Sequence, residues 1–449
     1  MRSRIIKLTV VLSLLFILTL TASAEEITQS VTLEGITVSS VTDGALSTHA
    51  LSREIAVKSD KPIHAIYLIY NKASDGGLLN GEAPIAQHGF LHELIEVDGL
   101  NELKLTYNTD ADLCDIRVFG EGELPEDIER WETAPEGVDL LLLATHSDDD
   151  QLFFAGLLPR YASIEGVRVA VAYFANHYDT YNRTHELLQG LWHCGVKYYP
   201  EISPFPDGYS ESVDGAKAFL SSRGVTDGDV QAFHEMLLER YKPLVVVLHD
   251  FKGEYGHGAH MHSTQSFIET LESVGETSVE KVYVHLYEEN SLVLDIDSPL
   301  EAFDGKTAFQ VSQEAFNYHK SHHWTWFYSW IYGKSTPITS STQISSYNPA
   351  HFGLYYTTVG KDELGGDMLE NVVTYAEREK PVEPEITEPE IVEPEITEPE
   401  EISKEEPTTI QSETEAELPV WIIAVVFLII IVILIIITAR RKKCRTFVL

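Results

Sequence analysis

The chain has 449 residues, of which 44% are hydrophobic and 10% aromatic, so its composition excludes wholesale disorder and provides for more than one folded domain. Its 32 Lys and Arg residues are outnumbered by 70 Asp and Glu residues, which gives a formal net charge of −38. A charge this negative argues against binding to nucleic acid, because phosphates require a basic surface. Three cysteines are too few for a disulfide framework.

The two ends of the chain predict secretion and membrane anchoring. Residues 1–24 combine a basic start, a short apolar run and a small-residue site at Ala24, which predicts a cleaved signal peptide, with an uncleaved anchor helix as the alternative. Residues 418–439 predict a transmembrane helix, and the basic residues 440–449 predict a cytoplasmic tail. The acidic, Pro-rich residues 377–417 predict an extended stalk. We therefore expect a single-pass plasma-membrane protein whose bulk is extracellular.

Short β-type runs, interrupted by Gly and Asp turns, fill residues 25–135 and predict an antiparallel β-sandwich. Val41-Thr42-Asp43-Gly44 near its start and the segment 114–120 near its end resemble galactose-binding-like (discoidin-type) jelly rolls. This resemblance implies either a sugar-binding module or a support for a neighbouring catalytic domain, and the sequence leaves both open.

The pattern changes in residues 136–376, where continuous apolar runs of strand length alternate with helical stretches. This alternation predicts an α/β domain with a Rossmann-like parallel sheet that is buried on both faces. In such sheets ligands bind at the carboxyl ends of the strands. The predicted strands cover residues 138–144, 167–174, 244–248 and 281–286.

Two clusters of polar residues follow the ends of predicted strands. The first is Thr145-His146-Ser147-Asp148-Asp149-Asp150, and the second is the histidine-rich segment 249–262. Imidazole and carboxylate groups suit Zn²⁺, and catalytic zinc sites use three protein ligands. Taken singly, an acidic run can cap a helix and a loop histidine can simply be hydrogen-bonded. Both clusters at strand ends of one domain favour a metal site.

Three motifs resemble the PIG-L / LmbE-like zinc-dependent N-acetylglucosamine deacetylases over residues 136–375. They are the segment 145–150, Arg183-Thr184-His185-Glu186, and Gly256-His257-Gly258-Ala259-His260. The resemblance implies that His146, Asp149 and His260 hold Zn²⁺, with another divalent transition metal as the alternative. It also implies that Asp148 is the general base.

The same resemblance implies roles around the metal. His257 would stabilise the oxyanion and Tyr255 would act as a further donor. Arg183 would hold sugar hydroxyls, with an ion pair to Glu186 as the equally open alternative. Ser147 and Asp150 stand where the family has proline and glutamate.

The expected function is a cell-surface deacetylase that acts on an N-acetylglucosamine-containing glycan or glycolipid. One alternative is a non-catalytic lectin or adhesin, and another is a zinc amidohydrolase acting on a non-sugar N-acyl substrate. The expected partners are an N-acetylated amino sugar and, through one helix, the membrane. The aromatic segment 316–330 is open between a wall of the substrate site and a packed core segment.

Overall fold

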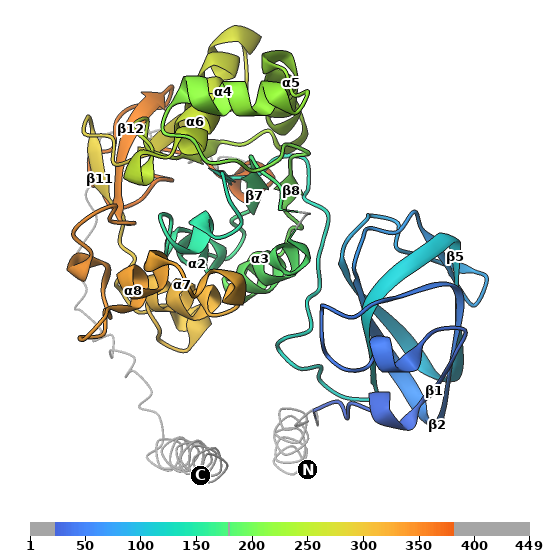
Figure 1. Cartoon of the computed structure of the whole chain (residues 1–449). Coiled ribbons are helices and arrows are strands. Elements are labelled where there is room, and N and C mark those ends of the chain that lie inside the picture. Colours follow the sequence, from blue (N-terminus) through green and yellow to red (C-terminus); the bar gives the residue numbers. More distant parts are fainter. Residues whose placement is uncertain (1–22, 178–179, 381–449) are drawn as a thin grey trace, which may run out of the picture. The chain divides into compact units, whose positions relative to one another are not determined.

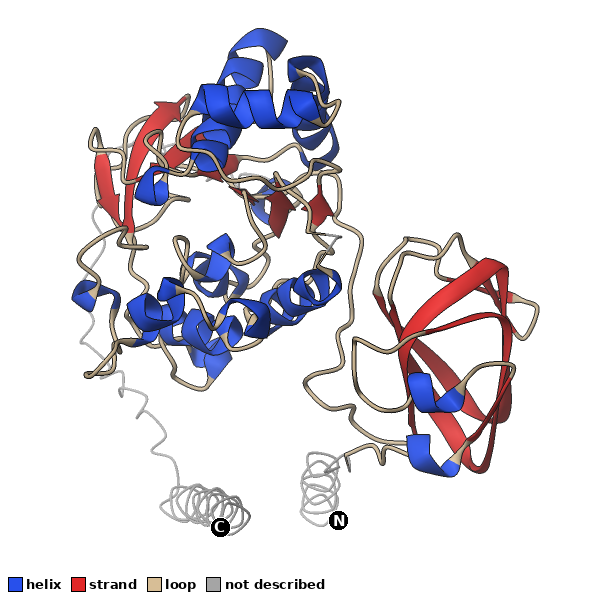
Figure 2. Ribbon diagram, in the orientation of Figure 1, coloured by secondary structure: helices blue, strands red, loops and turns tan. Residues whose placement is uncertain are grey.

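The computed structural model describes residues 23–177 and 180–380, in which a seven-stranded sheet lies between two layers of helices (Figures 1 and 2). The strand order is β11-β12-β10-β9-β6-β7-β8. In chain order the strands are β6 (Leu140–Ala144), β7 (Val169–Tyr173), β8 (Glu201–Ile202), β9 (Val245–Leu248), β10 (Lys281–His285), β11 (Ser291–Val293) and β12 (His351–Thr357).

The central strands are apolar along their whole length because both faces of the sheet are covered. Leu140 and Leu142 of β6 belong to one hydrophobic cluster, whereas Leu141 and Leu143 belong to another. Successive side chains of a strand point to opposite faces, so the two clusters lie on the two sides of the sheet.

The helices divide between these two clusters. The first cluster contains side chains of α2 (Leu157–Ala162), α3 (Tyr181–His193), α7 (Ala308–Phe316) and α8 (Trp326–Tyr332). The second contains side chains of α4 (Val213–Ser222), α5 (Asp227–Tyr241) and α6 (Gly258–Val274). A short helix, α9 (Tyr375–Arg378), follows the last strand. Figure 1 shows α4, α5 and α6 on one side and α2, α3, α7 and α8 on the other.

The predicted parallel sheet needs correction because this sheet is mixed. Strands β6 to β10 pair in parallel, but β12 runs antiparallel to both β10 and β11. The predicted strands do not include residues 351–357, so the apolar runs indicated neither β12 nor the direction in which it joins the sheet. The parallel strands alone bring their carboxyl ends to one edge.

The predicted antiparallel sandwich in residues 25–135 also needs correction, because the strands there form one five-stranded sheet. Two very long strands dominate it, and Ile66 of β2 pairs with both Ile95 and Val118 of β5. Gly99 has a φ of 62°, so the chain can bend there without leaving the sheet. The turn predicted at this position therefore lies inside β5 and does not end a strand. The strands are β1 (Thr32–Glu34), β2 (Ala50–Tyr70), β3 (Gly77–Leu79), β4 (Ala83–Ile85) and β5 (His92–Phe119).

The predicted membrane anchor is the third correction. No helix in the part of the chain that the structure describes is both long and apolar enough to cross a bilayer. This finding stands against the predicted single-pass location in the plasma membrane. The segment 418–439, the tail, nearly all of the stalk and residues 1–22 of the predicted signal peptide lie outside the described residues.

Candidate metal centre

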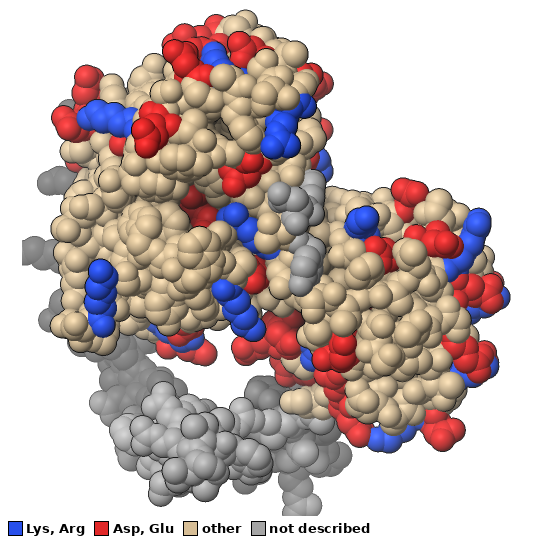
Figure 3. All heavy atoms as spheres, in the orientation of Figure 1, with Lys and Arg blue, Asp and Glu red and all other residues tan. Residues whose placement is uncertain are grey.

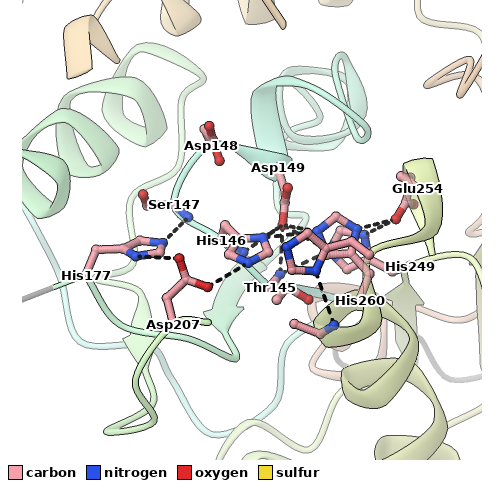
Figure 4. Close-up of polar contacts among 12 residues, drawn as sticks. Thr145, His146, Ser147, Asp148, Asp149, His177, Asp207, His249, Glu254 and His260 are labelled. Atoms are coloured by element: carbon pink, nitrogen blue, oxygen red, sulfur yellow. Dashed lines mark hydrogen bonds and ion pairs between the residues drawn. The ribbon is translucent and has the colours of Figure 1, made fainter. Parts of the chain in front are cut away.

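The predicted metal ligands meet at the carboxyl edge of the parallel strands (Figure 4). His146 and Asp149 follow β6, and His260 lies in the first turn of α6, which begins after the loop that leaves β9. All three side chains are buried. The fold therefore brings together residues that are separated by more than one hundred positions in the sequence.

Three atoms of these residues converge in the geometry of a metal site. His146 Nδ1 lies 3.0 Å from His260 Nε2 and 3.2 Å from Asp149 Oδ2. Asp149 Oδ2 lies 3.5 Å from His260 Nε2. Ligands at about 2.0–2.1 Å around a tetrahedral zinc are separated by about 3.3–3.4 Å. The donor set and its spacing thus fit Zn²⁺ with one coordination position left over.

Glu254 orients His260 from behind. Its Oε2 lies 2.6 Å from His260 Nδ1, and because a carboxylate can only accept, that nitrogen carries the proton. His260 Nε2 therefore presents a lone pair toward His146 and Asp149. Burial raises the pKa of Glu254, but His249 and His260 outweigh burial and hold this pKa well below its usual range.

Asp207 orients His146 in the same way. Its Oδ1 lies 3.1 Å from His146 Nε2, which leaves His146 Nδ1 facing the other ligands. Burial lowers the pKa of His146, but Asp207 and Asp149 outweigh burial and raise this pKa to about 10. The surroundings of His146 therefore favour a positive charge, which a metal ion supplies as well as a proton does. A carboxylate behind each histidine ligand is the arrangement found around bound zinc.

Two further histidines lie close enough to join the metal set, since His257 groups with His146 and His260, and His249 groups with Asp149 and His260. His249 Nε2 accepts the Thr145 N–H at 3.0 Å, so its lone pair is engaged and it positions the loop after β6. His257 Nδ1 accepts the Ala259 N–H at 3.2 Å and caps α6, which places the proton on Nε2. Burial, reinforced by the neighbouring His146, lowers the pKa of His257 to about 2. A neutral His257 with Nε2–H suits the predicted donor role.

Asp148 is buried beside these ligands but makes different contacts. Figure 4 shows no dashed line from Asp148 to the other residues drawn. Arg183 Nη2 lies 3.4 Å from its Oδ1 and His322 Nδ1 lies 3.1 Å from its Oδ2. Burial raises the pKa of Asp148, but His322 and Arg183 outweigh burial and lower it. Asp148 is therefore a carboxylate at neutral pH.

Arg183 binds the loop that carries the predicted base. Its Nε donates to Ser147 Oγ at 3.0 Å, in addition to its contact with Asp148. The alternative ion pair with Glu186 is not formed, because Glu186 accepts instead from the backbone and hydroxyl of Ser321. Ser147 thus serves as the acceptor for Arg183.

Tyr255 lies at the site with a left-handed φ of 46°. Its ring packs edge-on against His257, at 5.4 Å between centroids, and against His260, at 5.8 Å. Asp150 is also buried, and its Oδ2 accepts from Gln151 at 2.5 Å. Burial raises the pKa of Asp150 well above its usual range.

Residue patterns alone missed several members of this site. They are Glu254, Asp207, His249, His285 and His322. Glu254 and His249 lie inside the histidine-rich segment 249–262 and His322 lies inside the aromatic segment 316–330, but the sequence assigned none of them a role at the site. His285 is the last residue of β10 and lies 2.6 Å from Glu254 Oε1, so a histidine at a predicted strand end was an available signal. Asp207 comes from the loop between β8 and α4, where no motif marks it.

Comparisons of this chain with protein families and with curated proteins find no match. A solved structure titled "CpGH89CBM32-6 produced by Clostridium perfringens" is similar to part of the chain, with 16% sequence identity and a TM-score of 0.17. The similarity covers 21% of this chain and 99% of that chain. A TM-score this low supports no conclusion about fold or function.

Proposed function

We propose that this protein is a zinc-dependent amidohydrolase that removes the acetyl group from N-acetylglucosamine in a glycan or glycolipid. The observation that carries the proposal is the convergence of His146 Nδ1, Asp149 Oδ2 and His260 Nε2 within 3.0 to 3.5 Å of one another. The three motifs that resemble the deacetylase family supply the substrate class.

When bound, Zn²⁺ supplies a Lewis acid and lowers the pKa of a coordinated water from 15.7 to about 7. The protein's own part in the reaction begins with Asp148, which takes a proton from the attacking water. Arg183 and His322 keep Asp148 ionised and fix its position.

The carbonyl oxygen of the acetamide becomes negative as the water attacks. His257 donates its Nε2–H to this oxygen, a role that its neutral state and its engaged Nδ1 prepare. Asp148 then passes its proton to the departing nitrogen as the C–N bond breaks, which releases acetate and a free amino sugar.

An assay of acetate release tests the proposal. The full-length chain with zinc would be incubated with N-acetylglucosamine and its short oligomers, and bound metal would be measured in parallel. We expect Asp148→Asn to retain zinc but to lose at least about a hundredfold in kcat, because general acid–base catalysis contributes at least that factor. The matched control is Asp214→Asn, which changes an exposed carboxylate on α4.

Each outcome has a distinct meaning. Zinc in both proteins with acetate from the wild type alone would support Asp148 as the base of a deacetylase. Zinc without acetate from any of the sugars would keep the metal site and refute the substrate class. A chain that binds no zinc would refute the proposal and favour a non-catalytic binding protein.

A further inference from the structure

Three large aromatic side chains lie exposed on the two segments that contact the candidate site, and Trp326 and Tyr209 touch its residues directly. The exposed fractions are 83% for Trp324, 46% for Trp326 and 63% for Tyr209. We call these three residues the aromatic rim. Apolar rings of this size are usually buried, so three of them at one site call for a binding explanation.

The aromatic rim continues directly from the proposed catalytic residues. Trp326 packs edge-on against Tyr255, with 5.8 Å between ring centroids, and Tyr209 packs edge-on against His257, at 5.0 Å. Tyr255 and His257 in turn contact each other. Trp326 thus contacts Tyr255 and Tyr209 contacts His257. A ligand bound at Tyr255 and His257 would therefore lie next to these two exposed rings.

The segment that carries the two tryptophans is tied to the site. Ser321 donates through its backbone N–H and its hydroxyl to Glu186 of α3, and the next residue, His322, contacts Asp148. The indole N–H of Trp324 donates to Ser321 O at 2.7 Å, which holds an otherwise exposed ring in place. A ring that is already ordered loses little entropy when a ligand binds.

Charge narrows the class of ligand. The net charge of −38 repels polyanions, and the surface over α7 and α8 in Figure 3 consists mainly of uncharged residues. A neutral sugar ring combines an apolar C–H face, which stacks on an aromatic ring, with hydroxyl groups at its edge that stay in water. A neutral sugar therefore fits exposed aromatic rings better than a wholly apolar ligand, which would present no hydroxyl edge to water.

We infer that the aromatic rim is a saccharide subsite, in which sugar units next to the N-acetylated unit stack on Trp326 and Trp324. This inference rests on the proposed function, since it extends the same site to a substrate of more than one sugar. The segment 316–330 is then a wall of the substrate site at its exposed tryptophans. Its first residue, Phe316, belongs to the hydrophobic core, as does Ile331 directly after the segment.

A binding titration tests the subsite without requiring turnover. The Asp148→Asn full-length chain would be titrated with the N-acetylglucosamine trimer and with the monomer, with and without Trp324→Ala or Trp326→Ala. We expect each tryptophan substitution to weaken trimer binding about tenfold and to leave monomer binding unchanged. The matched control is Tyr356→Ala, an aromatic that is 40% exposed and pairs with Val282, away from the carboxyl edge of β10.

An affinity for the trimer that neither tryptophan substitution changes, or no trimer binding at all, would overturn the subsite. Tyr209→Ala, on a different segment, serves as a second variant if a tryptophan variant misfolds. Acetate release by the wild type separates the two proposals. Trimer binding through the tryptophans without acetate would leave the subsite and refute the deacetylase. Acetate released equally from monomer and trimer by the wild type and by tryptophan variants that keep Asp148 would leave the deacetylase and refute the subsite.

Discussion

Glu254 is a single buried carboxylate that accepts from three imidazoles. Its Oε2 lies 2.6 Å from His260 Nδ1 and 2.8 Å from His249 Nδ1, and its Oε1 lies 2.6 Å from His285 Nδ1. The three rings come from α6, from the end of β9 and from β10. One side chain thus sets the tautomer of a metal ligand and ties it to two strands of the sheet.

Replacing this carboxylate by an amide provides a test at the residue scale. In Glu254→Gln at least one histidine would face an N–H₂ group in place of an acceptor. We expect zinc affinity to fall about 10- to 100-fold, as for other partners that orient metal ligands. Competition with a zinc chelator would measure the change. Glu269→Gln, at an exposed position on α6, is the control, and unchanged affinity in Glu254→Gln would contradict the orienting role.

The residue pattern predicted the candidate metal ligands but not the groups that would orient them. His146, Asp149 and His260 stand in recognisable motifs, and the structure brings their donor atoms together. Asp207 is 61 residues from His146 in a loop without a motif, and His322 contacts Asp148 from the aromatic segment 316–330, to which the sequence assigned no catalytic role. Such contacts depend on how loops pack, which local residue patterns do not encode.

At the scale of elements, the start of α6 determines where two histidines point. His257 caps this helix and His260 lies in its first turn. The Gly258 N–H donates to Ser210 O at 2.7 Å, and a Cβ on Gly258 would overlap Ser210 Oγ and Ser212 O. The helix can approach the loop of Asp207 this closely only because residue 258 has no side chain.

The substitution Gly258→Ala therefore should push the start of α6 away from that loop. We expect a loss of about 1–3 kcal/mol in the free energy of unfolding from overpacking, together with weaker zinc binding. Gly228→Ala on α5 is the matched control, because the nearest atom to a Cβ there is Thr226 Oγ1 at 3.6 Å. Gly228 is the second residue of α5, so this change should alter the free energy of unfolding by less than the roughly 0.5–1 kcal/mol that is typical of a helix interior. Denaturant unfolding with a zinc titration would measure both, and normal zinc binding in Gly258→Ala would contradict this account.

The same scale shows what the pattern of apolar runs can and cannot predict. The runs at β6, β7, β9 and β10 correctly indicated buried strands and the edge that carries the site. They did not indicate that β12 returns antiparallel, or that β5 continues through Gly99. Strand direction and continuity are set by partners far away in the sequence.

At the scale of the whole molecule, a buried ion pair and the candidate metal centre lie at opposite edges of the sheet. Lys281, at the amino end of β10, is fully buried and forms an ion pair with Asp362. Tyr283 also donates to Asp362, at 2.5 Å. This ion pair holds the segment after β12 against the sheet, whereas His285 at the carboxyl end of β10 belongs to the metal centre.

Lys281→Met should therefore separate folding from activity. Leaving Asp362 without its partner is expected to cost about 3–5 kcal/mol in the free energy of unfolding. Zinc affinity of the fraction that remains folded should be unchanged. Lys58→Met, which breaks an exposed pair with Glu34, should cost no more than about 1 kcal/mol. Thermal unfolding would show the difference, and equal losses in both variants would refute the assignment.

The central claim is the metal centre, and a calorimetric titration of zinc into the metal-free full-length chain tests it most directly. We expect one zinc per wild-type chain, and binding that is lost in His146→Ala and in His260→Ala. His351→Ala, at an exposed position on β12, should bind like the wild type. Binding of no zinc by the wild type, or equal binding by all four proteins, would contradict the account.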